Sequence, residues 1–423
     1  MDINMPVSWK EKSYGLIQVI KNLESIRENK VDGKAQFDGF AFKQLETILY
    51  GILNFSSDIP EIDSRNMLSK ALINRGGIGE ITQDNLLDEV KKLEREYQSL
   101  PITRYALASS ISINPNSILN NIRLGNNLII FESTLASRFR REAQNLLHEA
   151  EQSLFATAPT NYLQLRVHVS EKSIECAARK ALETIDFVRG IWNWVLNRRH
   201  SIRISFGGKS KPVNKIILGP LHTLHRPNGA LATSTNWWYE PSYLGSITPL
   251  LVNQDDLGRF YKSLDHVKKK FKTLPYRIIV RDGLIRYTRA LDERDWTTAF
   301  VKLWSILELL TASGGTNYDV TIRRTAYIFQ ERDFHHQVLQ NLRDYRNSSV
   351  HADNENSEIE TFLYQIKSYV ENLIGFHINN RYGFDSMQEA AEFLSLPYDD
   401  NTLKHKIKLY QFAVKFRGSH SGG

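Results

Sequence analysis

The sequence predicts a mostly helical α+β protein, in which an N-terminal α+β module (residues 1–272) precedes a C-terminal helical bundle (residues 276–416). A chain of 423 residues is too long for one ordinary hydrophobic core. Several segments between residues 101 and 218 alternate apolar and polar residues, as strands do. From Tyr276 onward, apolar residues recur at helical spacing instead.

The composition is that of a folded globular protein, with 41% hydrophobic and 24% charged residues. No apolar run approaches the roughly 18 to 20 residues that cross a bilayer, and the first residues do not resemble a secretory signal. Cys176 is the only cysteine, so an intramolecular disulfide and a cysteine-based zinc cage are excluded. These features favour a cytoplasmic protein without a membrane partner.

The N-terminal module is expected to begin with helices, because apolar residues recur at helical spacing in residues 14–23, 42–49 and 86–93. Alternating patterns then predict strands at residues 105–113, 127–131, 162–169, 201–206 and 215–218. Longer periodic segments predict helices at residues 134–155 and 173–197. Residues 221–246, rich in Gly, Pro, Thr and Asn, are expected to be irregular.

The C-terminal module has the start and stop signals of a four- or five-helix bundle. Asp295 can cap a helix that ends at Gly314, and further helices are expected at residues 320–330 and from residue 333. The sequences Ser-Glu-Ile-Glu at 357–360 and Ser-Met-Gln-Glu at 386–389 are capping boxes that open two more. Residues 417–423 resemble a tail left by cloning and are excluded from the fold prediction.

The most informative segment is residues 344–353, where a periodic helix becomes polar and carries Arg346, Asn347 and His351. At about 100° per residue, Asn347 and His351 share a helix face, while Arg346 starts about 140° from His351. These residue types suit RNA cleavage without a metal. A histidine can move the proton of a ribose 2′-hydroxyl. The arginine fork can bind the growing charge on phosphorus, and the asparagine can orient either group.

The same letters also fit a structural role. An arginine followed by a histidine five positions later is common by chance, and Arg346 could instead pair with Asp344 or Asp353 at a surface helix end. The sequence pattern alone leaves both interpretations open.

Residues 285–380 resemble the HEPN superfamily, whose mark is an arginine, a polar residue and a histidine a few positions on, set in a helical bundle. Residues 346–351, Arg-Asn-Ser-Ser-Val-His, match that pattern. The helix at residues 299–310 is also similar to the one that precedes the motif in the Apea-like branch of bacterial phage-defence proteins. The first 270 residues resemble no family in this way.

The resemblance implies a metal-independent endoribonuclease with Arg346, Asn347 and His351 as catalytic residues and no cofactor. It further implies a homodimer with a composite site at the bundle interface, often a toxin or antiviral defence effector. Some HEPN domains do not cleave RNA, so a non-catalytic module that pairs with a defence or toxin–antitoxin partner is the alternative. The N-terminal module would then sense a phage or other trigger, bind a regulatory protein or steer RNA.

Several further residues are predicted to support this site. Glu308, an acid among apolar neighbours in mid-helix, could hold Arg346 or Arg324, and Tyr345 could stack on a base. Lys302, Arg323 and Arg324 are candidate contacts to the RNA backbone. Residues 259–289 contain ten Lys or Arg and only two Asp, and such clustered positive charge attracts polyanions. This run includes the candidate RNA-binding residues Lys268, Lys269 and Lys270.

Two other groups of residues carry weaker signals. His222 and His225 could bind a metal, but they lack the helical spacing and carboxylate of a zinc enzyme. Trp237, Trp238 and Tyr239 could stack on bases, although packing beneath a loop is the more common role.

Overall fold

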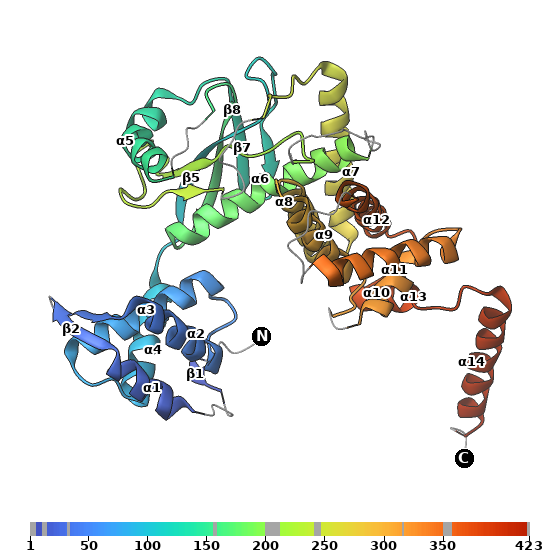
Figure 1. The fold of residues 1–423 in the computed structure, drawn as a ribbon, viewed down its shortest axis with the longest axis horizontal. Helices are drawn as coiled ribbons and strands as arrows, with labels where there is room; N and C mark the ends of the chain where they lie inside the picture. The colour runs from blue at the N-terminus through green and yellow to red at the C-terminus, as the bar shows by residue number, and fades with distance from the viewer. Residues whose placement is uncertain are drawn as a thin grey trace.

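The computed structural model describes residues 6–10, 15–31, 34–154, 159–198, 212–240, 247–314, 317–349 and 358–420. The fold is α+β and mostly helical, with a mixed N-terminal region followed by an all-helical C-terminal region (Figure 1). The predicted fold class is therefore confirmed. Among the described residues, no helix is both long and apolar enough to cross a membrane.

Residues 6–99 build a helical region with its own hydrophobic core. Its helices are α1 (Leu16–Ser25), α2 (Gly39–Ile52), α3 (Glu61–Ile78) and α4 (Gln83–Ser99). Two short antiparallel pairs accompany them, β1 (Ser8–Trp9) with β4 (Leu53–Asn54) and β2 (Arg27–Val31) with β3 (Lys34–Phe37). Leucines from different helices, such as Leu23, Leu49, Leu68 and Leu72, are fully buried together. This core is separate from that of the remaining chain.

A six-stranded antiparallel sheet follows, in the strand order β10–β9–β5–β8–β7–β6. Its strands are β5 (Thr103–Ile111), β6 (Ile122–Leu124), β7 (Asn127–Glu132), β8 (Leu163–Glu171), β9 (Leu221–His225) and β10 (Trp238–Tyr239). The central pair aligns Thr103 with Glu171 and Ile111 with Leu163. Alternate residues of β8 point into the main core, so this face of the sheet is apolar and can be covered by a helix.

Helix α6 (Ile174–Asn197) covers that face and continues into the bundle (Figure 1). Its C-terminal half packs so closely on α8 (Arg277–Leu291) that a Cβ on Gly190 would lie 2.7 Å from the Leu284 carbonyl oxygen. Farther along, the Trp194 indole donates to the Glu371 carbonyl oxygen at 3.2 Å. One core therefore runs from the sheet through α6 into the bundle, and the predicted boundary near residue 272 does not divide it. Helix α5 (Ser137–Leu154) lies beside β9.

The bundle is built from α7 to α13. In addition to α8, its helices are α7 (Gln254–Thr273), α9 (Trp296–Leu310), α10 (Tyr318–Ala326), α11 (Arg332–Ser349), α12 (Ile359–Asn379) and α13 (Met387–Phe393). Asp295 caps α9 and Ser386 caps α13, as expected. The predicted cap at Ser357 lies outside the described residues. Helices α8, α9 and α12 pack together and support α10 and α11.

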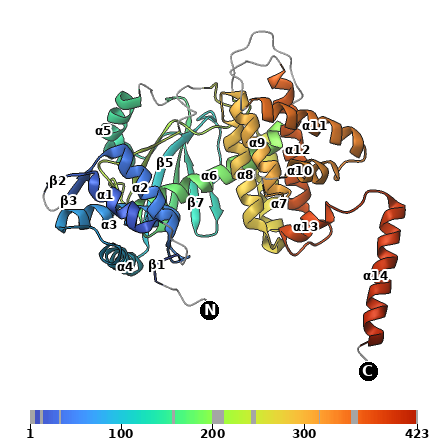
Figure 2. The same ribbon diagram turned by 60° about the horizontal axis from the view of Figure 1, so that its bottom comes forward.

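The last helix, α14 (Asp400–His420), projects away from the bundle in both views (Figures 1 and 2). Its apolar side chains are exposed, for example Tyr410 at 67% and Val414 at 73%. The helix includes residues 417–420, part of the segment that the sequence analysis set aside as a tail.

The largest differences from the sequence-based expectation concern strands. Residues 221–246 were expected to be irregular, but they contain β9 and β10, whose pairing with β5 buries every residue of β9. Residues 215–218 form no strand, although Leu218 makes an isolated bridge to Ile111. The strand predicted at residues 201–206 lies outside the described residues. The β2–β3 hairpin was missed because its strands are largely polar.

Candidate active site

The described residues of the candidate motif lie in the last turns of α11, which we call the motif end of α11 (residues 343–347). Tyr345 anchors this end because it is only 9% exposed and its ring packs between two others. The Phe300 ring of α9 lies edge-on at 5.0 Å, and the Phe362 ring of α12 lies at 4.8 Å. The Tyr345 ring is therefore part of the bundle core, which does not leave it available to stack on a base.

Arg346 follows this anchor and is partly exposed. Its guanidinium carbon lies 4.8 Å from the centre of the Tyr318 ring at the start of α10. This cation–π contact holds the guanidinium over an aromatic surface that is itself fixed by the bundle. The Tyr318 ring in turn meets the Trp304 ring edge-on at 6.0 Å.

Glu308 belongs to the same chain of contacts, but not through an arginine. The Trp304 indole donates to a Glu308 carboxylate oxygen at 2.9 Å. Within the described part of the chain, Glu308 forms no ion pair with Arg346 or Arg324. The predicted direct contact is thus replaced by two aromatic rings, Trp304 and Tyr318, between the carboxylate and Arg346.

The other motif residues are placed less fully. Asn347 is exposed at the end of α11, as a group that meets a ligand from solvent must be. His351 lies outside the described residues, and so does Asp353. Asp344 pairs with Arg343 at 3.1 Å, and Arg343 also reaches Asp319 of α10 at 2.9 Å. The Arg343–Asp319 ion pair therefore braces the motif end of α11 against α10.

The predicted backbone-binding residues of the bundle fall into two groups. Arg324 is structural, because it donates to the carbonyl oxygens of Thr311 (2.6 Å) and Ala312 (3.0 Å) and to the Ser395 hydroxyl (2.8 Å). It thereby satisfies carbonyl groups just beyond the C-terminal end of α9. Arg323, next to it, is exposed. Lys302 is also on the surface and forms an ion pair with Glu293.

Lys268, Lys269 and Lys270 are not at the motif end of α11. Lys270 donates to the Asn379 carbonyl oxygen at 3.3 Å, at the C-terminal end of α12. Tyr345 contacts Phe362 near the other end of the same helix. A helix rises about 1.5 Å per residue, so about 25 Å of α12 separates these two points. The prediction that this lysine cluster contributes to the site is not supported by this placement.

Part of the basic segment is neutralised by neighbouring acids. Arg259 pairs with Asp256, Lys268 lies 4.0 Å from Asp265, and Arg286 lies 2.8 Å from Asp282. Each pair is one helical turn long, an arrangement typical of solvated helix surfaces.

The sequence analysis missed a buried polar network between α6, α8 and α12. Its centre is Arg189, whose side chain is 1% exposed. The guanidinium donates to Asp186, to both carboxylate oxygens of Asp292 (3.2 and 2.9 Å) and to the Ile216 carbonyl oxygen (3.0 Å). A buried charge is tolerated only when it is paired and hydrogen-bonded, as it is here.

The network continues along α6 to α12. The Asn193 amide donates to Thr288 at 3.0 Å, and the Asn197 amide donates to the Tyr287 hydroxyl at 3.2 Å. The Tyr287 hydroxyl donates to Glu371 at 2.5 Å. Lys367 then joins Glu371 (2.9 Å) to the carbonyl oxygen of Asn197 (3.0 Å). The network therefore ties the sheet-covering helix to two bundle helices.

Burial perturbs the ionisable groups of this network. Burial raises the pKa of Asp292 and of Glu371, against the opposing effects of Arg189 and Lys367 respectively. Burial also raises the pKa of Tyr287 well above its ordinary value, reinforced by the neighbouring Glu371. Burial works against the charged form of Arg189, but Asp292 and Asp186 more than compensate, so its pKa lies above the usual range. The ion pairs Arg189–Asp292 and Lys367–Glu371 thus oppose the effect of burial on these ionisable groups.

A signal for this network was present in the sequence. Asp186, Arg189, Asn193 and Asn197 recur at spacings of 3, 4 and 4, which places them on one face of a helix. The rest of that helix is strongly apolar and predicts burial. A polar stripe on a buried helix indicates internal partners, although it does not name them.

The network also reaches the sheet. Arg289 of α8 pairs with Asp186 and lies 3.9 Å from Glu240. A carboxylate oxygen of Glu240 lies 3.5 Å from Nε2 of His222, and Nδ1 of the same ring lies 2.8 Å from the Ser109 hydroxyl. Ser109 is 5% exposed, so this arrangement connects strands and does not face a substrate.

The second histidine considered as a metal ligand is also structural. His225 is fully buried and is hydrogen-bonded to the Thr223 hydroxyl and the Gly229 carbonyl oxygen, at 2.9 and 2.8 Å. Within the described ranges, no group of three or more His, Cys, Asp or Glu side chains lies close enough together to hold a metal ion. Of Trp237, Trp238 and Tyr239, the last two form β10, and Trp238 packs against the main core.

Comparison of the chain with protein families, with curated proteins and with solved structures finds no significant match.

Proposed function

We propose that this protein is a metal-independent endoribonuclease whose site forms at the motif end of α11. The observation that carries the proposal is the setting of Arg346, a partly exposed guanidinium held over the Tyr318 ring beside the exposed Asn347. A permanently charged, planar donor fixed in this way is suited to a phosphodiester arriving from solvent. The motif and its resemblance to HEPN proteins supply the rest of the argument.

In the proposed reaction, the ribose 2′-oxygen attacks phosphorus and the bond from phosphorus to the 5′-oxygen breaks. One His351, unprotonated, removes the proton of the 2′-hydroxyl, and a second, protonated His351 gives a proton to the departing 5′-oxygen. Arg346 binds the non-bridging oxygens, on which charge grows in the transition state. The products carry a 2′,3′-cyclic phosphate and a 5′-hydroxyl, and DNA is not a substrate because it lacks the nucleophile.

The second histidine is proposed to come from a second copy of the chain, so the active species is a homodimer. The rigid support of Arg346 favours this arrangement, because a composite site requires each half to be held in place before the halves meet. Tyr345 supplies that support from the core, and the Arg343–Asp319 ion pair supplies it from α10. Arg323, exposed on α10, remains a proposed contact to the RNA backbone.

The proposed biological role is that of a cytoplasmic toxin or antiphage effector, with the N-terminal region responding to a trigger or to a regulatory protein. The test of the chemistry is incubation of purified protein with total RNA in EDTA, followed by mapping of the ends. The wild type is expected to leave cyclic phosphate ends, and His351→Ala and Arg346→Ala are expected to leave the RNA intact.

A control is Arg277→Ala, which removes an exposed arginine charge from α8, outside the motif end of α11 and its supporting contacts. It is expected to retain cleavage within a few-fold. Wild-type activity that disappears in EDTA would overturn the metal-independent mechanism. Activity in a strictly monomeric sample would overturn the composite site. RNA left intact by a dimer, with or without candidate triggers, would favour the alternative of a non-catalytic assembly module.

A further inference from the structure

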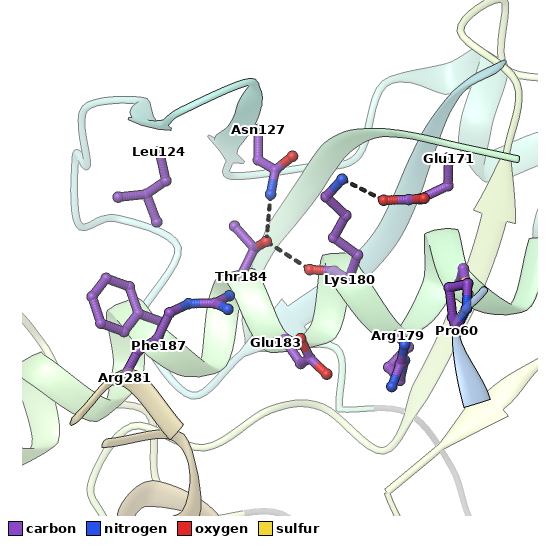
Figure 3. A pocket seen from close by; sticks show the side chains of 11 residues that line it. Pro60, Leu124, Asn127, Glu171, Arg179, Lys180, Glu183, Thr184, Phe187 and Arg281 are labelled. Atoms are coloured by element: carbon purple, nitrogen blue, oxygen red, sulfur yellow. Dashed lines mark hydrogen bonds and ion pairs between the residues drawn. The ribbon is translucent and has the colours of Figure 1, made fainter. Parts of the chain in front are cut away.

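A polar cavity of about 480 Å³ lies where α6 meets the β6–β7 hairpin, α8 and the start of α3 (Figure 3). Charged side chains line it from α6 and α8, and Glu171 of β8 adds another. Its size falls within the roughly 300–1,000 Å³ of small-molecule sites. It also lies outside α9–α12, which carry the proposed ribonuclease site.

Basic side chains outnumber acidic ones in the lining of this cavity. Lys180 and Glu171 pair with each other, as the dashed line in Figure 3 shows. Arg179 of α6 and Arg281 of α8 form no ion pair with any residue that the structure describes. Glu183 is the remaining acid, so the lining carries an excess of positive charge. A cavity with two available guanidinium groups favours an anionic ligand, and their forked geometry suits phosphate in particular.

The position of Arg281 is defined by its neighbours. Its guanidinium carbon lies 5.6 Å from the centre of the Phe187 ring of α6. The Phe187 ring is held from behind by Phe271 of α7, at 5.6 Å. The arginine is thus supported by an aromatic stack, and Leu124 adds a second apolar surface.

The polar wall of the cavity is also organised. The Asn127 amide donates to the Thr184 hydroxyl at 2.9 Å, and that hydroxyl donates to the Lys180 carbonyl oxygen at 2.6 Å. These bonds fix the orientation of the Asn127 amide above α6, as Figure 3 shows. A fixed amide beside an apolar surface and two cations provides recognition for the organic part of a ligand as well as for its phosphate.

We propose that this cavity binds a small organic phosphate of mononucleotide or sugar-phosphate size. Arg179 and Arg281 supply the positive charge that attracts the phosphate, Phe187 and Leu124 contact the organic part, and Asn127 with Glu183 hydrogen-bonds its polar groups. Pro60 contributes to the cavity from the N-terminal region, so the bound ligand also touches the junction between the two hydrophobic cores. This site is independent of the ribonuclease proposal.

The test is isothermal titration of the full-length protein with separate probes. The probes are the four ribonucleoside 5′-monophosphates, glucose 6-phosphate, inorganic phosphate and adenosine. At least one organic phosphate is expected to bind saturably at one molecule per chain, which also identifies the source of the ligand. Arg179→Ala and Arg281→Ala are each expected to weaken that binding at least tenfold. Arg277→Ala removes an exposed charge from α8 outside the cavity and is expected to bind normally.

The variant Arg346→Ala separates this site from the proposed ribonuclease site, and it is expected to bind the same ligand with unchanged affinity. Loss of binding in Arg346→Ala, with binding retained in both cavity variants, would place the ligand at the motif and overturn the proposal. Absence of saturable binding of any organic phosphate to the wild type at millimolar concentration would also overturn it. The proposal would also be overturned if inorganic phosphate or adenosine bound as tightly as the organic phosphates do. Circular dichroism of each variant checks that it remains folded.

Discussion

Arg189 and Arg346 carry the same guanidinium group in opposite settings. Arg189 is 1% exposed and bonds two carboxylates and a carbonyl oxygen at the junction of α6 and α8. Arg346 lies at a helix end, partly exposed, with an aromatic ring beneath it. The first arrangement uses the donors to join protein elements, whereas the second positions a charge near solvent. The setting of an arginine, more than its presence, therefore separates a structural role from a proposed catalytic one.

The largest expected effect is on stability, at Arg189. The change Arg189→Met keeps much of the side-chain length but leaves Asp186 and Asp292 buried without their shared cation. Breaking a buried ion pair in this way costs about 3–5 kcal/mol. Urea unfolding followed by circular dichroism measures the loss, and Arg277→Met, an exposed arginine on α8, serves as the control. A loss no larger than that of the control would show that the network does not depend on the cation.

The second effect is on catalysis, at Arg346. Arg346→Ala is expected to lower single-turnover RNA cleavage by about 10²–10³-fold, the usual effect of removing one transition-state donor. Arg346→Lys should recover only part of the rate, because lysine keeps the charge and loses the fork. Both variants should unfold within about 1 kcal/mol of the wild type, as expected of a substitution outside the core. Cleavage by Arg346→Ala at the wild-type rate would remove this residue from the mechanism.

The third effect tests burial by pH. His377 is fully buried beneath α9 and hydrogen-bonded to the Leu310 carbonyl oxygen at 2.7 Å, and burial lowers its pKa to about 4. The unfolded chain therefore binds more protons than the native chain between about pH 6.5 and pH 4. Stability should be complete above pH 6.5 and fall by on the order of 2–3 kcal/mol as the pH approaches 4.

The matched variant for this test is His377→Gln, which can still donate to Leu310 but does not titrate. Comparing urea midpoints at pH 7 and pH 4.5 isolates the histidine from the carboxyl groups common to both proteins. Identical pH dependence in the two proteins would contradict the assignment.

The smallest expected effect belongs to Lys268 and Lys269. The double change to alanine removes two charges at the end of the bundle remote from Arg346, about 25 Å along α12. RNA cleavage at physiological salt should change less than about twofold, because charges so far apart are screened from one another. Comparison with Arg323→Ala, whose residue lies on α10, would sharpen the contrast. A tenfold loss in the lysine variant would mean that the RNA path extends along α12.

Local features of this chain were predictable from sequence because they depend on neighbouring residues. The caps at Asp295 and Ser386 and the helical course of the segment before Arg346 all follow from short-range chemistry. The position of Lys268–270 was not predictable, because sequence adjacency to the bundle does not say which end of a helix pair they reach. Tyr345 was expected to stack on a base, and its packing against Phe300 and Phe362 was not predictable from its neighbours in the sequence.

Strands were harder to predict than helices for a related reason. β9 contains two histidines and a threonine, and it becomes a strand because β5 and β10 pair with it. The polar stripe of α6 could be recognised from its spacing, but Asp292, Glu371 and Lys367 are identified as its partners only by the tertiary structure. The membership of the network is thus a property of the fold and not of any one segment.

The continuity of α6 has a consequence for how such a protein can be rearranged in evolution. A recombination event near residue 272 would transfer the C-terminal helices without Arg189, Asn193 and Asn197. The buried side chains of Asp292, Thr288 and Lys367 would then lack their partners on α6. A viable exchange needs to carry the sheet and α6 along with the bundle. The linker between α4 and β5, where one hydrophobic core ends and the other begins, is the more permissive crossover point. The N-terminal helical region is therefore the part of this chain that recombination can exchange most readily for another domain.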